Sequence, residues 1–437
     1  MQDLERRDDF VWPLWQKLLF RFFFIYFLLF ISPWSWLNII PGAQLILDYV
    51  DKMQIWAVIK CNAHFFHVFN IRDVKPFYNG SGDTSYFWAE QWFHLAVAFT
   101  GGLIWSVSDR KRKAYNGLNY ILRLALRYSL ALIAFDYGIS KIFLLQMHFP
   151  SLSQMATPLG DLLPMRFSWL FIGYSAPYEI FSGIMEVLVG LLLIFRRTAT
   201  MGVLVATVVF VNVMMLNLCY DIPVKLYAMN IVLMCFYLIA NQSKRIINIF
   251  VYNRTAEACA LYHYPLHRKW MRVTRIVLKL MVLYMVIRSV FNQYDEYKTL
   301  YKSVEVKAIP VGIYNVNKFV INKDTITPGI DTLRWQDMIL EKGGAGSINT
   351  KDTSFKRRYG RGYFNFTTDT NNHTIAFKKL SQDSTPIFTM NYFIPDSLTI
   401  QLRGKKKNDS LYVELKKSDR HFQLAERQFH WLSEANR

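Results

Sequence analysis

The chain has 437 residues, of which 52% are apolar and 19% are charged, whereas an average soluble domain has about 25% charged residues. Its 51 Lys and Arg exceed its 32 Asp and Glu by 19. This composition excludes a disordered chain and a coiled coil, and it argues against a simple soluble enzyme. Long apolar runs dominate up to about residue 292, and the remainder is polar. We therefore predict a membrane-embedded helical domain over 1–292 and a water-soluble domain over 293–437.

Seven apolar stretches approach the roughly 20 residues that a membrane-spanning helix needs. They are 18–40, 88–108, 121–146, 178–195, 199–220, 224–240 and 274–292. Trp34 and Trp36 close the first stretch and no small-residue cleavage site follows it, so it is a span and not a signal peptide. The stretch 54–71 has two interpretations, a half-span or a helix lying in the membrane interface. We expect a polytopic α-helical bundle of about seven spans.

Basic residues in the loops predict the orientation of these spans. With seven spans, every strongly basic loop falls on one side, and the positive-inside rule assigns that side to the cytoplasm. The residues are Arg110, Lys111, Arg112, Lys113, Arg196, Arg197, Lys244, Arg245, Arg254, Arg268, Lys269, Arg272 and Arg275. We expect a multi-pass protein of a bacterial inner membrane, with a cytoplasmic N-terminus and a periplasmic C-terminal domain. The same bias explains much of the net charge, which argues against a nucleic-acid partner.

The C-terminal part shows the period-two alternation of half-buried strands. Apolar side chains alternate with polar ones at Ile375 and Phe377, at Leu398, Ile400 and Leu402, and at Leu411, Val413 and Leu415. Turn signals recur about every ten residues, as expected of an antiparallel all-β sandwich or small barrel. This part contains no evident nucleophile, metal-ligand cluster or phosphate loop. We expect 293–437 to dock an envelope or periplasmic protein.

Ionisable residues inside predicted spans are functional candidates because burying them in a membrane is costly. In the span 178–195, Glu179, Gly183, Glu186 and Gly190 follow a 4-3-4 spacing, which places them on one helix face. Glycines let another helix approach closely, so this face should point into the bundle.

Further polar candidates gather toward the outward half of the predicted membrane region. They are Asp136, Lys141, Asn212, Asn217, Asp221 and Lys225. We predict that Lys141, Glu186, Asp136 and Asp221 handle protons, and that Glu179, Asn212, Asn217 and Lys225 bind a ligand. The competing interpretation is that such residues only hold helices together, each worth about 1 kcal/mol or less.

A glycine-rich segment, 79–84, precedes the second predicted span on its outward side. Asp83 or Thr84 caps the helix that follows, or the segment lies at a ligand entrance with Asp83 as a binding residue. It is not a Walker loop, because no Gly-Lys-Ser/Thr follows. His64 and His67 have the spacing of two metal ligands on one helix face, but no third ligand is evident, so no metal site is predicted.

Short motifs in three segments carry a family resemblance. Gly138 and Lys141 form a G-x-x-K motif, Gly183, Glu186 and Gly190 form G-x-x-E-x-x-x-G, and 212–225 follows. Over about 120–240 the chain resembles the DoxX-like superfamily of membrane proteins, which is built on a four-helix membrane bundle. With its extra N-terminal spans and its β domain it is similar to the long DoxX-like form of Bacteroidetes. Spans followed by an outward β domain are also similar to vitamin K-dependent carboxylase-like membrane proteins.

The resemblance implies quinone-coupled redox chemistry. The strong spans contain no heme-ligand histidine pair and the chain has no redox cysteine pair, so the cofactor would be a quinone such as menaquinone. Lys141 and Glu186 would then handle protons or bind the quinone head group. Two functions remain, and they leave open whether the protein is an enzyme. One is a quinone-linked oxidoreductase acting at the outward membrane face. The other is a non-enzymatic anchor or accessory subunit of an envelope complex.

Overall fold

The computed structural model describes residues 11–40, 42–77, 79–255, 269–301, 309–327, 333–352, 354–380, 386–406, 408–427 and 430–432. The chain forms two compact units. The first contains 1–146 and 177–294, and the second contains 147–176 and 295–437. A segment between two helices of the first unit is therefore part of the second.

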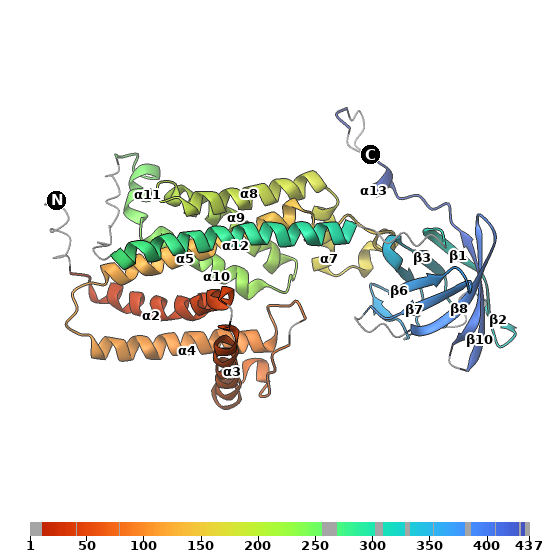
Figure 1. Ribbon diagram of the computed structural model, residues 1–437, viewed down its shortest axis with the longest axis horizontal. Helices are drawn as coiled ribbons and strands as arrows, with labels where there is room; N and C mark the ends of the chain where they lie inside the picture. Colours follow the sequence, from red (N-terminus) through yellow and green to blue (C-terminus); the bar gives the residue numbers. More distant parts are fainter. Residues whose placement is uncertain are drawn as a thin grey trace. The chain divides into compact units, whose positions relative to one another are not determined.

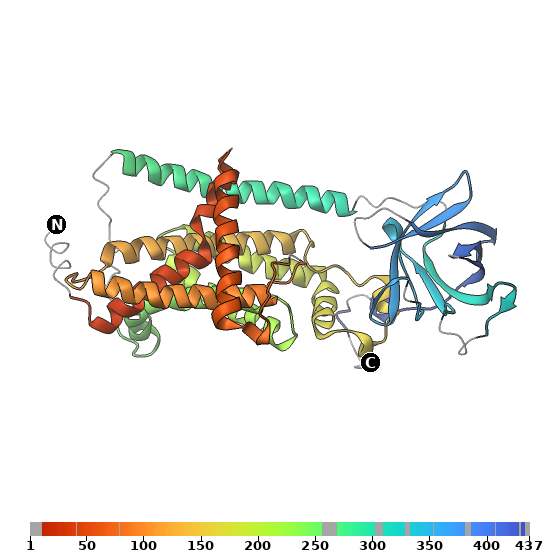
Figure 2. The same cartoon turned by 90° about the horizontal axis from the view of Figure 1, so that it is seen from below.

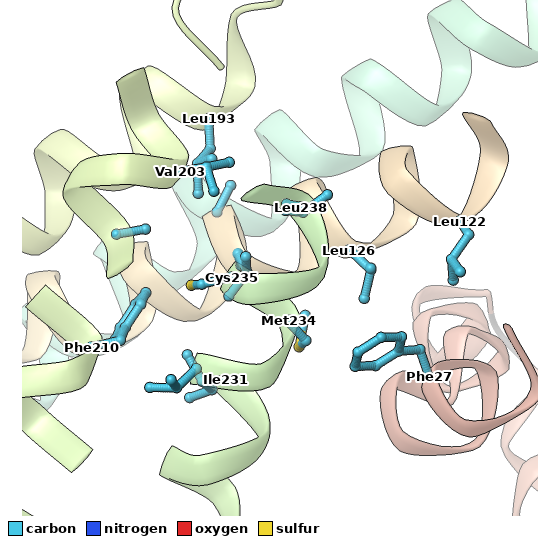
Figure 3. Close-up of a cluster of buried hydrophobic side chains, with 14 of the residues drawn as sticks. Phe27, Leu122, Leu126, Leu193, Val203, Phe210, Ile231, Met234, Cys235 and Leu238 are labelled. Atoms are coloured by element: carbon cyan, nitrogen blue, oxygen red, sulfur yellow. The ribbon is translucent and has the colours of Figure 1, made fainter. Parts of the chain in front are cut away.

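The first unit is helical (Figure 1). Its helices are α2 (Leu14–Ile31), α3 (Gln44–Cys61), α4 (Ser85–Ser108), α5 (Asn116–Ile142), α8 (Ala176–Ile194), α9 (Ala199–Cys219), α10 (Lys225–Ala240), α11 (Ser243–Phe250) and the main part of α12 (Lys269–Tyr301). Helices α2, α5, α8, α9 and α10 share an apolar core, part of which Figure 3 shows around Phe27, Leu126, Leu193 and Cys235. Many outward side chains, such as Val208, are apolar too. Helices that are apolar all round are typical of membrane spans.

Four helical segments within the described residues are long and apolar enough to cross a membrane. They are Leu14–Asn38, Asn116–Ile142, Ala176–Ile194 and Ala199–Cys219. Helices α10 and α11 would provide a fifth if together they form one span broken by a 78° bend. Helices α4 and α12 cover the predicted spans 88–108 and 274–292, but they are not among these candidates. The count of seven spans therefore stays a prediction.

The stretch 54–71 does not form a single helix. Helix α3 covers its beginning, and a π-helical turn over Asn62–Phe66 and a 3₁₀ turn over Val68–Asn70 follow. Figures 1 and 2 show α3 crosswise to α2 and α4, end-on in the first view and lengthwise in the second. Among the two interpretations of this stretch, a crosswise helix favours the interfacial one.

The second unit contains a closed antiparallel β-barrel of eight strands. They are β1 (Gly312–Ile321), β3 (Asp337–Leu340), β4 (Ala345–Ile348), β6 (Arg361–Asp369), β7 (Thr374–Lys378), β8 (Pro386–Asp396), β9 (Thr399–Lys406) and β10 (Asp409–Lys417). The order is β1-β3-β4-β6-β7-β8-β9-β10, and β10 pairs with β1 to close the barrel. The short strands β2 (Asp324–Thr325) and β5 (Lys356–Arg358) pair with β1 and β6. Closure removes unpaired sheet edges, so the predicted all-β domain is a barrel and not a sandwich.

Side chains fill the barrel, as expected for eight strands. The alternating residues Ile375, Phe377, Ile400 and Leu402 all point into this core and are buried. Trp335 lies within 5.7 to 6.3 Å, between ring centroids, of the rings of Phe319, Phe355, Phe377 and Phe388. An aromatic core of this kind leaves the outer surface of the barrel, and not its interior, for binding.

Candidate functional site

Lys141 and Glu186 form an ion pair inside the helical unit. The distance between Lys141 Nζ and Glu186 Oε1 is 2.5 Å, and the two residues are only 6% and 1% exposed. Lys141 lies in the last turn of α5, and Glu186 lies in the middle of α8. The structure thus brings together the two motif residues that the sequence placed on separate helices.

Two glycines allow α5 and α8 to approach closely enough for this pair. A Cβ atom on Gly138 would lie 2.8 Å from the backbone oxygen of Gly183, and one on Gly183 would lie 2.6 Å from that of Gly138. Real Cβ contacts are not that short, so only glycine fits at both positions. On each helix the charged residue follows its glycine by three positions, about one helical turn. The motif spacing therefore sets the helix contact and the ion pair together.

The pair keeps some hydrogen-bonding capacity. Glu186 Oε2 is buried and has no hydrogen-bond partner among the described residues. The ammonium group of Lys141 lies 5.8 Å from the ring centroid of Tyr137, within the range of a cation–π interaction. This arrangement can hold a proton or accept a hydrogen bond from one polar group at Oε2. It also links two helices through charges that have little access to solvent.

A second charged group surrounds the start of α10. The Asp83 carboxylate accepts hydrogen bonds from the backbone N–H groups of Lys225, at 2.8 Å, and Leu226, at 3.0 Å. Lys225 Nζ lies 3.6 Å from Asp83 Oδ2 and 2.7 Å from Asp221 Oδ1. Asp83 therefore caps α10, where an acidic side chain stabilises the positive end of the helix dipole.

This cap corrects the expectation that Asp83 or Thr84 caps the helix that follows them. Thr84 precedes α4, but its side chain makes no capping hydrogen bond. Gly82 N–H donates instead to the carbonyl of Pro223 at 2.7 Å, which holds the glycine-rich segment against the start of α10. The Asp83 carboxylate, which the local sequence predicted as a cap for α4, therefore caps α10 through a tertiary contact.

The other predicted site residues differ from one another in exposure and in the contacts they make. Asp136 is exposed, and its Oδ1 atom accepts hydrogen bonds from Ser289 and Gln293 of α12, at 3.0 and 3.2 Å. Asn212 is exposed on α9, whereas Asn217 and Glu179 are buried in α9 and α8. Asp221 pairs with Lys225, and no ion pair in the described part of the chain joins it to Lys141 or Glu186. Asp221 is therefore paired with Lys225 and not with the two motif residues.

The segment 147–176 packs on the barrel within the second unit. It contains α6 (Leu152–Met155) and α7 (Pro164–Gly173). Glu341 of the barrel accepts hydrogen bonds from Ser151 Oγ, at 3.2 Å, and Ser153 N–H, at 3.1 Å. Ala156 packs against the buried side chains of Ile313 and Ile339. This segment is part of the barrel unit and not a free connection between helices.

A buried polar chain completes this contact. Arg361 forms an ion pair with Asp337 and donates through Nε to Ser347 Oγ at 2.9 Å, and Ser347 Oγ donates to Ser153 Oγ at 2.7 Å. Arg361 is 3% exposed. Sequence reasoning missed these residues, because nothing in the spacing of isolated serines and one arginine marks them as partners.

Comparison with known proteins gives one informative relative. No family model and no solved structure matches the chain. The uncharacterized protein YwoB of Bacillus subtilis strain 168 is 31% identical over 133 residues. The aligned part covers 28% of this chain and 79% of YwoB.

Proposed function

Since the chain belongs to the same family as the uncharacterized protein YwoB, we propose a function for a member whose length greatly exceeds the shared part. It is a multi-pass membrane protein whose helical unit anchors the β-barrel at the outward face of a bacterial inner membrane. There the outer surface of the barrel docks an envelope or periplasmic protein.

The observation that carries this proposal is the segment 147–176. It lies between α5 and α8, which are two of the candidate spans, yet it belongs to the barrel unit. If α5 and α8 cross the membrane, the barrel must lie on the side where α5 ends and α8 begins. The basic residues flanking the opposite ends, at 110–113 and 196–197, favour the outward side for the barrel.

Cysteine labelling tests whether the segment 147–176 and the barrel lie on the same side of the membrane. In a variant whose native cysteines are replaced by serine, single cysteines are introduced by Leu159→Cys in the segment, Asn408→Cys in the barrel and Lys111→Cys in a basic loop. All three positions are exposed. A membrane-impermeant maleimide applied to cells with a permeabilised outer membrane should label positions 159 and 408 but not 111. Labelling of only one of 159 and 408 would refute the arrangement.

Photo-crosslinking tests the docking function. Phe393 is a large apolar residue that is 63% exposed on β8 of the barrel. A photoreactive residue at this position should give one discrete crosslinked product in cells. The same residue at the exposed turn position Asn371 serves as the control. Equal, diffuse crosslinking at both positions would argue against a specific partner.

A quinone-linked oxidoreductase is the second candidate, and the Lys141–Glu186 pair favours it. An ammonium donor beside a carboxylate oxygen that accepts no hydrogen bond from the described part of the chain has the chemistry to bind a quinone carbonyl and take up a proton. A bound quinone would supply the redox chemistry itself. Purification in mild detergent tests this candidate. Stoichiometric co-extracted menaquinone that is lost in Glu186→Gln supports it, and a quinone content equal in both proteins contradicts it.

A further inference from the structure

Three polar side chains from three helices form a closed hydrogen-bond ring in the helical unit. The hydroxyl of Tyr26 on α2 donates to Asn230 Oδ1 on α10. Asn230 Nδ2 donates to Gln91 Oε1 on α4 at 3.1 Å, and Gln91 Nε2 donates to the Tyr26 hydroxyl at 2.7 Å. Tyr26 and Asn230 are buried, and Gln91 is half-buried.

This ring lies in the wall of a cavity of about 390 Å³. The volume is in the range of small-molecule sites, roughly 300–1,000 Å³. The other lining residues are Phe22, Trp88, Trp92, Leu95, Leu226, Met229 and Leu233. Trp92 lines the cavity and is 50% exposed, so the cavity communicates with the surface of the unit beside that ring.

Within the ring, only Gln91 has an amide hydrogen that is not used. Asn230 uses both amide hydrogens, because Nδ2 also donates to the carbonyl of Leu226 at 2.9 Å. Gln91 uses one of its two amide hydrogens and one of the two lone pairs of its oxygen within the ring. Gln91 can therefore both donate a hydrogen bond to a ligand and accept one.

The lining also restricts the kind of ligand. Among the described residues, no Lys, Arg, Asp, Glu or His side chain lines the cavity, so a charged molecule would lack a counter-charge. The rings of Phe22 and Tyr26 stack with centroids 6.0 Å apart and planes at 7°, and two tryptophans add further aromatic surface. Aromatic walls favour a flat ring, which can stack on them, over a flexible chain.

We propose that this cavity binds an uncharged, lipid-soluble molecule with a planar ring that carries a hydroxyl or carbonyl oxygen. The ring stacks among the aromatic side chains, and its oxygen hydrogen-bonds to the Gln91 amide. The site does not depend on the docking function of the barrel, and it is separate from Lys141 and Glu186, neither of which lines the cavity.

Calorimetric titration of the full chain in detergent micelles with 2-naphthol tests the proposal. Binding should be saturable with one site, and Gln91→Leu should weaken it about tenfold or more, because a ligand oxygen then loses its partner. Met229→Trp places a larger side chain at another lining position, leaves the three residues of the hydrogen-bond ring unchanged, and should abolish binding. It also keeps the test valid if Gln91→Leu fails to fold.

The chain offers a matched control in a second phenol–amide network. The hydroxyl of Tyr237 donates to Asn119 Oδ1 at 3.0 Å, and Asn119 Nδ2 donates to Asn241 Oδ1 at 2.9 Å, but none of the three lines the cavity. Tyr237→Phe should therefore bind 2-naphthol like the parent protein.

Two other probes identify competing occupants. If 1-decanol binds as tightly as 2-naphthol, and Gln91→Leu affects neither, the cavity is a generic apolar site and the proposal is wrong. If dioleoylphosphatidylglycerol displaces 2-naphthol mole for mole, the cavity holds a phospholipid and the proposal is equally wrong. Absence of saturable 2-naphthol binding to the parent protein would overturn it outright.

Discussion

Removing Lys141 should destabilise the helical unit far more than removing an exposed partner of another ion pair. In Lys141→Met, Glu186 Oε1 loses its partner at 2.5 Å, and Oε2 already has none among the described residues. The remaining carboxylate is 1% exposed, so water cannot replace the lost contact. Leaving one half of a buried ion pair uncompensated costs about 3–5 kcal/mol. Glu186→Leu should cost a similar amount, because it strands the ammonium group of Lys141.

The double variant Lys141→Met/Glu186→Leu distinguishes a buried charge penalty from damage to packing. Replacing both charges with apolar side chains of similar size is often neutral or stabilising. The double variant should therefore recover most of the stability lost in either single variant. Asp221→Asn is the control, since the Asp221 side chain is 78% exposed in its pair with Lys225. Exposed pairs contribute roughly 0–1 kcal/mol.

Unfolding midpoints in detergent for the parent and all four variants are the measurement. Additive losses in the double variant would refute the reasoning, because they would mean that the two side chains do not interact. A cell phenotype for the same variants separates structure from chemistry. If the pair only joins α5 to α8, function should return with stability in the double variant. If Lys141 and Glu186 handle protons, function should stay lost.

Four further perturbations address other contacts. Gly183→Ala should separate α5 from α8 and lower the free energy of unfolding by about 1–3 kcal/mol, seen as a lower unfolding midpoint, because the new Cβ atom would lie 2.6 Å from a backbone oxygen. Gly160→Ala, in open space, is the control. Arg361→Met should destabilise the barrel by about 1–3 kcal/mol, since it removes the ion-pair partner of the half-buried Asp337 and the donor to the buried Ser347 hydroxyl. Arg334→Met should change the unfolding midpoint little in the same assay, because it removes two buried donors, Nε and Nη1, that have no hydrogen-bond partner among the described residues, but also the donation from Nη2 to the Val316 carbonyl at 3.1 Å. Burial opposes ionisation of Asp352, but hydrogen bonds from Lys406 and Ser354 outweigh it and lower the pKa of Asp352. The ion pair between Asp352 and Lys406 should stabilise the barrel fully above about pH 4, the ordinary pKa of an aspartate, and less as the pH falls through the lowered pKa. Asp352→Asn should therefore flatten the acid dependence of the unfolding midpoint.

Local pattern predicted the strands but not how they close. The alternation at 411–415 and 400–402 needs only neighbouring residues, and both segments are strands with these apolar side chains inside. Closure depends on β1 pairing with β10, for example Phe319 opposite Val413. Such pairing joins segments far apart in the chain and leaves no local signal, so sandwich and barrel could not be separated from the sequence.

The candidate site shows the same limit. Helical spacing was enough to place Glu186 and two glycines on one face of α8, and all three are buried. It could not predict the pairing with Lys141, because that depends on the contact between two separate helices. Predicted depth in the membrane alone also grouped Asp221 with Lys141 and Glu186, whereas the Asp221 carboxylate pairs with Lys225, four residues later on the chain. Residue spacing therefore predicts which residues share a helix face, whereas tertiary packing determines which of them form ion pairs.

The segment 147–176 lies in the chain between the two helices that form the candidate site. Its ends are joined to α5 and α8, the helices that carry Lys141 and Glu186 and meet at Gly138 and Gly183. If this segment anchors the barrel, as proposed above, a contact between α5 and α8 would keep its two ends close together. The close backbone contact at Gly138 and Gly183 and the Lys141–Glu186 ion pair hold these two helices together. The motif residues that the sequence marked for chemistry thus also join α5 to α8, the two helices to which the ends of this segment are connected.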